Sequence, residues 1–142
     1  MSEENKAIVQ RIVHEIWNAG NLNLADELIS PDYVDSVAGS DTPVGPEGFK
    51  DAVNGVRDAF PDFAITIKDM ISEGDKVALV WTFIGTHKGE LMGIEPTDKL
   101  IEFDGIYVYK FKDGKLVQRS GIRDVFRLMS QLGASTEQQV KI

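Results

Sequence analysis

The chain has 142 residues, a formal net charge of −8 and a hydrophobic share of 42%, which fits one soluble globular domain. It has no cysteine and only two histidines, which excludes disulfides, thiolate nucleophiles, zinc–sulfur sites and a histidine-rich metal site. No apolar run approaches the roughly 20 residues that span a bilayer, and no secretory signal is recognisable, so a cytoplasmic protein is expected. An acidic surface repels phosphate groups, so neither nucleic acid nor a membrane is an expected partner.

The first half of the chain has helical periodicity. Apolar residues recur on one face over residues 4–17, which predicts an amphipathic helix. A second, short helix is expected over residues 23–29 with Asn23 as its cap, and a short extended piece over 32–36. Residues 49–60 carry apolar side chains at helical spacing and predict a third helix.

The second half of the chain has the two-residue period of strands. Four strands are predicted, over residues 63–71, 76–87, 99–111 and 115–124. Residues 125–132 return to a short helical pattern, and the polar tail 134–142 is expected to be frayed. Helices followed by an antiparallel meander predict an α+β fold, a single domain over residues 1–142 with its core at about 6–133. The helices should pack on one face of a curved, mainly antiparallel sheet that encloses a pocket.

The last predicted strand carries the candidate for proton transfer. Strict alternation divides it into a basic face with Arg119 and Arg123 and a more apolar face with Leu116, Gln118, Ser120, Ile122 and Asp124. Burial raises the pKa of a carboxyl group, and a carboxyl tuned in this way can act as general acid or base. Asp124 is therefore a candidate catalytic residue. The alternative is that Asp124 caps the helix that follows it.

Aromatic side chains alternate along the two central predicted strands and indicate a pocket for a flat, apolar ligand. They include Trp81, Phe83, Phe103, Tyr107 and Tyr109, and the alternative for each is ordinary core packing. His87, at the end of its strand, either donates a hydrogen bond to a ligand carbonyl or satisfies the neighbouring loop. Asp35 either contributes a polar group at the pocket mouth or bonds its own backbone.

Several short motifs, in register over residues 6–133, give the chain a family resemblance. They are Trp17-Asn18-Ala19-Gly20-Asn21, Pro31-Asp32-Tyr33-Val34, Ala59-Phe60-Pro61-Asp62, Gly74-Asp75-Lys76-Val77, Gly85-Thr86-His87, Gly93-Ile94-Glu95-Pro96-Thr97, Asp113-Gly114-Lys115-Leu116 and Asp124 ahead of Gln131-Leu132-Gly133. In this order they resemble the SnoaL-like polyketide cyclases of the nuclear transport factor 2-like superfamily. The resemblance implies a cone-shaped α+β barrel with a deep pocket. It also implies a cofactor-free, intramolecular aldol-type cyclisation in which Asp124 exchanges the proton.

These observations define the candidate site. Asp124 and His87 are the expected catalytic residues, with no metal and no cofactor. The residues expected to contact an apolar or aromatic small-molecule ligand are Trp17, Asp35, Phe60, Trp81, Phe103, Tyr107, Gln118 and Ser120. Many relatives carry Glu and Trp where Gln118 and Ser120 stand, which favours the alternative of a binding protein without catalysis. A homodimer or higher homo-oligomer, paired through one face of the sheet, is expected by analogy with the superfamily.

Overall fold

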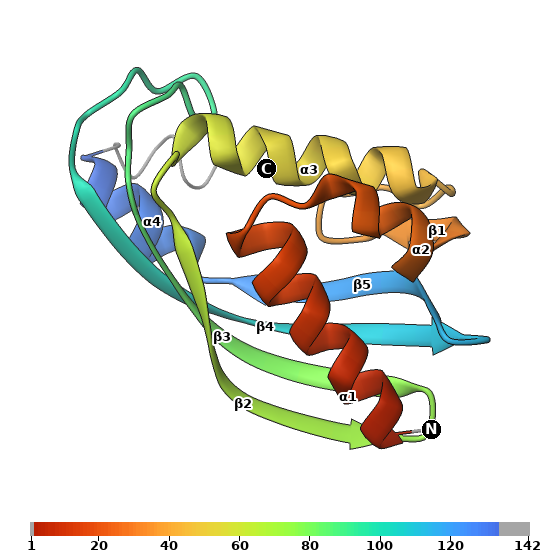
Figure 1. Ribbon diagram of the computed structural model, residues 1–142. Coiled ribbons are helices and arrows are strands. Elements are labelled where there is room, and N and C mark those ends of the chain that lie inside the picture. Colours follow the sequence, from red (N-terminus) through yellow and green to blue (C-terminus); the bar gives the residue numbers. More distant parts are fainter. Residues whose placement is uncertain (1, 134–142) are drawn as a thin grey trace.

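Five strands form one curved sheet in the order β1-β5-β4-β3-β2 (Figure 1). The structure is a computed structural model that describes residues 2–133, so the predicted tail 134–142 lies outside the described residues. The strands are β1 (Ile29–Asp35), β2 (Ala64–Glu73), β3 (Lys76–Thr86), β4 (Leu100–Lys112) and β5 (Lys115–Arg123). Strands β2 to β5 pair antiparallel, whereas β1 pairs parallel with β5. The α+β fold and its four-stranded meander are confirmed.

The main helices lie on one side of this sheet (Figure 1). The N-terminal helix begins as α1 (Ser2–Arg11) and continues with π-helical hydrogen bonding over Ile12–Asn18. A 3₁₀ turn (Leu22–Leu24) leads into α2 (Ala25–Leu28), and α3 spans Gly45–Ala59. The predicted cap by Asn23 is wrong, because Leu24 precedes α2 and makes no side-chain cap, and Ile29 already belongs to β1. No helix within residues 2–133 is both long and apolar enough to cross a membrane.

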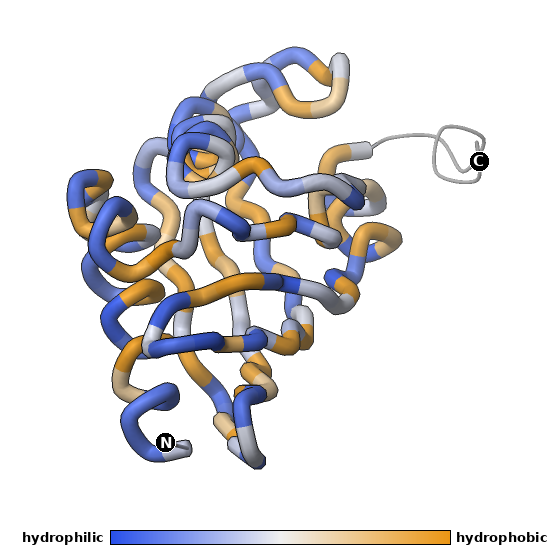
Figure 2. The backbone as a smooth tube through the Cα atoms, turned by 90° about the vertical axis from the view of Figure 1, so that its right-hand side faces the viewer, coloured by the Kyte–Doolittle hydropathy of each residue, from blue (hydrophilic) through white to orange (hydrophobic). Residues whose placement is uncertain are grey.

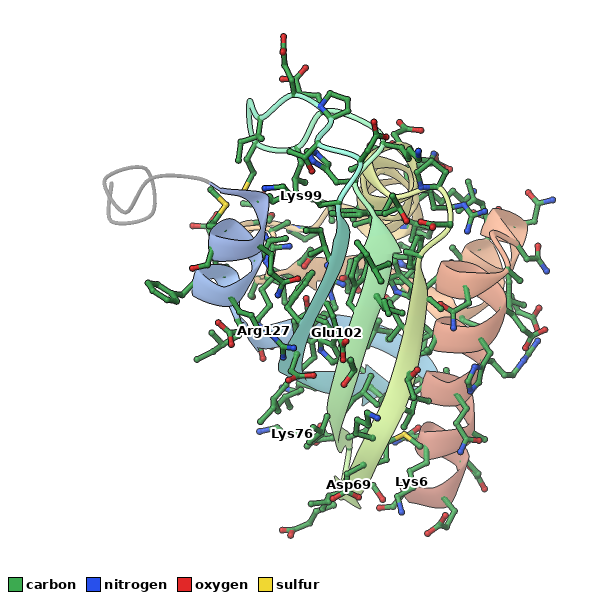
Figure 3. The ribbon with its side chains drawn as sticks, turned by 90° about the vertical axis from the view of Figure 1, so that its left-hand side faces the viewer. Lys6, Asp69, Lys76, Lys99, Glu102 and Arg127 are labelled. Atoms are coloured by element: carbon green, nitrogen blue, oxygen red, sulfur yellow. The ribbon has the colours of Figure 1, made fainter. Side chains whose placement is uncertain are left out.

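The closing helix α4 (Val125–Leu132) covers the end of β4. Strand β5 pairs with β4 only as far as Gly105, so the β4 backbone beyond that residue lacks a strand on this side. The side-chain amide of Gln131 supplies the missing partner, since its oxygen accepts from the N–H of Glu102 and its nitrogen donates to the carbonyl of Glu102. The charged side chains of this outer face, Glu102 and Arg127 among them, are visible in Figure 3.

The core lies between the inner face of the sheet and the helices. Along β4, alternate residues from Ile101 to Phe111 are buried, and those between them are exposed or half-buried. Burial alternates in the same way along β3. Figure 2 shows hydrophobic stretches of the backbone interspersed with hydrophilic ones. Apolar residues of the helices, including Ile12, Ile16 and Phe49, complete the core. Burial of each large apolar side chain contributes about 1.5–3 kcal/mol to the stability of the fold. A slip of one residue would turn these side chains to the outer face, so their burial fixes the register of the sheet.

A β-bulge in β5 changes which of its side chains face the core. Phe111 pairs with Leu116 but Lys110 pairs with Gln118, so Val117 is an extra residue in β5. Two residues then oppose one, and the alternation of side chains is reset beyond that point. The prediction of strict alternation over residues 115–124 is therefore wrong from Gln118 onward.

Candidate functional site

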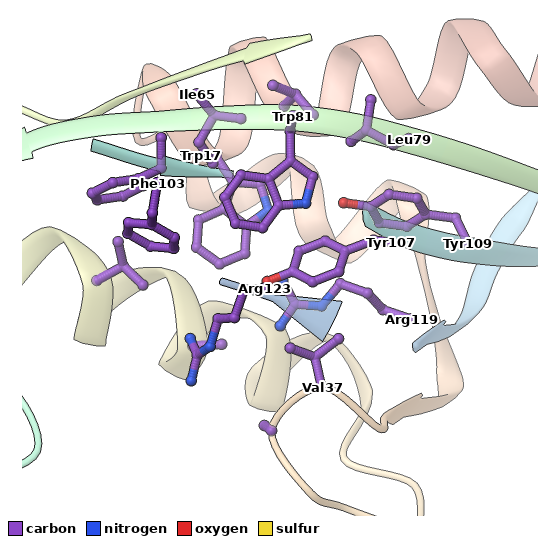
Figure 4. A pocket seen from close by; sticks show the side chains of 15 residues that line it. Trp17, Val37, Ile65, Leu79, Trp81, Phe103, Tyr107, Tyr109, Arg119 and Arg123 are labelled. Carbon is purple, nitrogen blue, oxygen red and sulfur yellow. The ribbon is translucent and has the colours of Figure 1, made fainter. Parts of the chain in front are cut away.

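A cavity of about 160 Å³ lies between the inner face of the sheet and the helices. Strands β3, β4 and β5 form its floor, while the N-terminal helix, α3 and the segment after β1 form its walls (Figure 4). Its lining residues are mostly apolar or aromatic: Val13, Trp17, Val37, Ala38, Ala52, Val56, Ile65, Leu79, Trp81, Phe83, Phe103, Tyr107, Tyr109, Arg119 and Arg123. A cavity of about 150 Å³ holds a molecule the size of benzene, so this one accepts at least one planar ring.

A buried ion pair supports one wall of the pocket. The Nη2 and Nε atoms of Arg119 donate to the two carboxylate oxygens of Asp35 at 2.8 and 3.3 Å. Arg119 is only 5% exposed and Asp35 only 2%. The backbone N–H of Ala38 donates to Asp35 Oδ1 at 3.2 Å, which also holds the loop after β1. Burial alone would lower the pKa of Arg119, but the acidic groups around it, Tyr33 and Asp35 first, raise that pKa above its usual value.

Two aromatic rings hold the Arg119 guanidinium in place. Its Cζ atom lies 5.3 Å from the ring centroid of Trp17 and 5.0 Å from that of Tyr107, within the range of cation–π attraction. Burial raises the pKa of the Tyr107 hydroxyl, and the neighbouring charge of Arg119 opposes this shift in part. Tyr107 is therefore a protonated hydrogen-bond donor at neutral pH. Figure 4 shows Arg119 and Tyr107 next to one another in the pocket.

The Trp81 indole reaches into the pocket because a glycine lies across from it. Trp81 on β3 pairs with Gly105 on β4, and a Cβ atom at Gly105 would lie 2.2 Å from Cζ2 of the indole. Trp81 is buried, and its Nε1–H has no hydrogen-bond partner among residues 2–133. An unpartnered buried donor is costly, and it points to a ligand atom that accepts from it.

The polar groups that line the pocket are donors: the indole N–H groups, the tyrosine hydroxyls and two guanidinium groups. Within the part of the chain that the structure describes, no carboxylate lines the pocket, and no cluster of three His, Asp or Glu side chains could hold a metal ion. The arrangement is suited to a flat, apolar ligand that carries hydrogen-bond-accepting oxygens.

The structure brings together half of the residues expected to contact a ligand. Trp17, Trp81, Phe103 and Tyr107 line the pocket, and Asp35 supports it through Arg119. Phe60 is buried but is not among the lining residues; it packs against Phe83 with a ring separation of 5.0 Å. Phe60 is therefore a core residue in this structure and not one that contacts the pocket.

The predicted placement of Asp124, Gln118 and Ser120 at the pocket is wrong. Beyond the bulge they share the outer face of β5 with Ile122, which is 79% exposed. Gln118 donates to the hydroxyl of Ser36 at 3.1 Å, outside the pocket. Asp124 is the N-cap residue of α4, and its Oδ1 accepts from the backbone N–H of Arg127 at 2.9 Å. The helix-cap alternative therefore describes the geometry of Asp124.

His87 is fully buried but does not line the pocket. Its Nδ1 accepts from the backbone N–H of Thr97 at 3.2 Å and lies 3.0 Å from the Thr97 hydroxyl. Its backbone also pairs with Lys99 and Asp98. These contacts correspond to the alternative in which His87 satisfies the loop, here residues 88–98.

Sequence reasoning missed the two cationic members of the site. Strict alternation assigns Arg119 and Arg123 to the basic face, opposite the candidate Asp124, and both line the pocket because Val117 resets the alternation. Nothing in the local sequence marks this bulge, since no glycine stands there. The burial of Asp35, which requires a cation beside its carboxylate, is apparent only in the structure.

Three comparisons with known proteins identify the family. The family model for SnoaL-like polyketide cyclases matches residues 7–132. Aklanonic acid methyl ester cyclase from Streptomyces galilaeus is 31% identical over 132 residues, covering 92% of this chain and 91% of the relative. Nogalonic acid methyl ester cyclase from Streptomyces nogalater is 29% identical over 119 residues, covering 82% and 89%. The solved structure of a proposed polyketide cyclase from Acidithiobacillus ferrooxidans has a TM-score of 0.82 and 30% identity, covering 92% of this chain and 94% of that one. The chain therefore belongs to the SnoaL-like polyketide cyclase family of enzymes.

Proposed function

We propose that this protein is a cyclase-type enzyme that binds a polyketide-derived carbonyl compound in the pocket and closes a ring by cofactor-free acid–base chemistry. The observation that carries the proposal is the apolar, aromatic cavity that is lined by hydrogen-bond donors, with Arg119 fixed by Asp35. Carbonyl oxygens accept from such donors, and a pocket of this shape can hold a flexible chain in ring-closing geometry. The two relatives named as methyl ester cyclases support this reaction class.

The residue that exchanges the proton is a separate part of the proposal. Asp124 matches the family position for this role, but its carboxylate caps α4 on the outer face of β5. A proton carrier needs to come within about 3 Å of the carbon that it deprotonates, directly or through one water. The proposed ligand pocket therefore stands independently of Asp124, and the role of Asp124 is tested by its own variants.

Turnover assays with the methyl esters of aklanonic and nogalonic acid test the proposed function. We expect the protein to convert at least one ester to a cyclised isomer of equal mass, resolved by chromatography. Ala52→Leu fills the pocket from α3 and should lower turnover at least tenfold, whereas Ala64→Leu, an equal enlargement at an exposed position of β2, should leave it unchanged. Equal effects of the two variants, or no turnover by the unmodified protein, would contradict the proposal.

A non-catalytic binding protein is the second candidate, favoured by the absence of a carboxylate among the described lining residues. Both tryptophans of the chain line the pocket, so tryptophan fluorescence reports its occupancy directly. Saturable quenching by the esters without any isomerised product would establish binding in place of catalysis.

The outer face of the sheet supports the proposed homodimer. Ile106 and Ile122 are exposed there beside Lys68 and Asp104, and a patch with both charge signs can pair with its own copy across a two-fold axis. Sedimentation equilibrium of the protein and of Ile122→Asp tests this pairing. We expect a dimer that the substitution converts to monomer, and a monomeric unmodified protein would refute it.

A further inference from the structure

The pocket carries a positive charge although the chain as a whole is acidic. Two guanidinium groups, Arg119 and Arg123, line it, and Asp35 neutralises only one of them. Arg123 makes no salt bridge to any residue between 2 and 133. A net positive charge beside aromatic walls favours an apolar ligand that carries a negative charge when bound.

Arg119 and Trp81 each present an N–H donor in this pocket without a hydrogen bond to the described residues. Asp35 engages Nε and Nη2 of Arg119, so Nη1 is left without a hydrogen bond to the described residues. Trp81 Nε1–H is the second such donor. The ring of Tyr107 connects the two, since its centroid lies 5.0 Å from Arg119 Cζ and 5.0 Å from the Trp81 ring centroid. Both donors thus border the same stretch of the cavity wall.

We infer that Arg119, Trp81 and Arg123 bind the enolate form of a 1,3-dicarbonyl ligand in preference to its neutral form. The inference rests on the proposed function and specifies the ligand state that this pocket selects. When a 1,3-dicarbonyl compound ionises, the C–H between its carbonyls gives its proton to the buffer, and the electron pair spreads over both carbonyl oxygens. These oxygens are stronger hydrogen-bond acceptors than neutral carbonyls. N–H donors without a partner, such as those of Arg119 and Trp81, therefore bind the enolate more tightly than the neutral form.

Asp35 acts as a positioning residue in this arrangement. Its bidentate contact and the rings of Trp17 and Tyr107 fix the Arg119 guanidinium, so Nη1 is oriented before a ligand arrives. Donors held in place in this way need no reorganisation when negative charge develops, which is why they are effective in stabilising it.

Spectrophotometric titration of benzoylacetone tests the inference, because its enolate and neutral forms absorb differently. We expect saturating protein to lower the pKa of benzoylacetone by at least about one unit, the tenfold preference expected for one added charge-assisted hydrogen bond. Arg123→Gln and Trp81→Phe should each reduce this shift. Arg127→Gln removes the same charge on the outer face, away from the pocket, and should leave the shift unchanged. A shift that is absent, or equally reduced by all three variants, would overturn the inference.

Two further ligands separate the inference from the proposed function. The 2,2-dimethyl derivative of benzoylacetone cannot ionise, and its binding, followed by tryptophan fluorescence, should depend on neither pH nor Arg123. If it binds while the pKa of benzoylacetone stays unshifted, the carbonyl pocket stands and the enolate preference fails. If neither diketone binds, both proposals fail. Benzoate that binds tightly while the diketone pKa stays unshifted identifies a carboxylate site and refutes the enolate preference.

Discussion

Removal of the Asp35 carboxylate is expected to destabilise the fold by several kcal/mol. In Asp35→Asn, the amide oxygen can still accept from the backbone N–H of Ala38, but the charge opposite Arg119 is lost. Both side chains are almost fully buried, and breaking such a pair from one side costs about 3–5 kcal/mol because the remaining charge is uncompensated. We expect about 3 kcal/mol for Asn and a larger loss for Ala, which also removes the acceptor of the Ala38 bond.

Urea unfolding followed by far-ultraviolet circular dichroism measures this loss without using the pocket tryptophans. The double variant Asp35→Asn/Arg119→Met should be more stable than Asp35→Asn alone, because it contains no unpaired buried charge. Lys50→Met is the control, because Lys50 pairs with the exposed Asp26 and Glu47, and exposed pairs contribute about 0–1 kcal/mol. A loss below about 1 kcal/mol in Asp35→Asn would refute the buried ion pair.

Three further predictions follow from packing, capping and burial. Gly105→Ala places a methyl group 2.2 Å from the Trp81 indole. We expect overpacking to lower the free energy of unfolding by about 1–3 kcal/mol and to alter the tryptophan fluorescence. An unchanged fluorescence spectrum would contradict the observed position of the indole. Asp124→Asn should be tolerated as a cap, whereas Asp124→Ala should cost about 1 kcal/mol in thermal unfolding; loss of turnover in a stable Asp124→Asn would instead establish the family role of this residue. Burial raises the pKa of all three tyrosines, so above pH 10 the unfolded state loses phenolic protons first, and stability should fall by up to about 1.4 kcal/mol per pH unit for each tyrosine. Tyrosinate absorbance that rises near pH 10 before circular dichroism changes would show that they are accessible.

The sequence predicted most of the fold because strong local periodicity was reinforced by burial. The strand predicted at 76–87 and the observed β3, Lys76–Thr86, agree within one residue, and the helix over 125–132 was placed correctly. Pairing between segments that lie far apart in the sequence is harder to predict from local patterns. The parallel contact of β1 with β5 joins residues more than 80 positions apart, and no two-residue period specifies a partner.

The site was harder to predict than the fold because it depends on one inserted residue. Aromatic members such as Trp81 and Tyr107 were identified from alternation, which their strands obey. Strand β5 obeys it only up to Val117. A shift of one residue exchanges the two faces of a strand. The bulge therefore places Asp124 on the outer face of β5 and Arg119 on its pocket face, so the basic face is the pocket wall.

This exchange of faces also determines which ligands can reach the site. With a net charge of −8, the chain repels anions as they approach, while the positive charge in the pocket acts only within about 10 Å because salt screens it beyond that distance. A ligand that is already anionic in water meets this repulsion, and its hydration is lost on entry. A neutral 1,3-dicarbonyl compound avoids both costs and gains its charge only beside Arg119 and Trp81. The opposed charges of surface and pocket therefore favour a substrate that ionises after it has bound, over one that arrives as an anion.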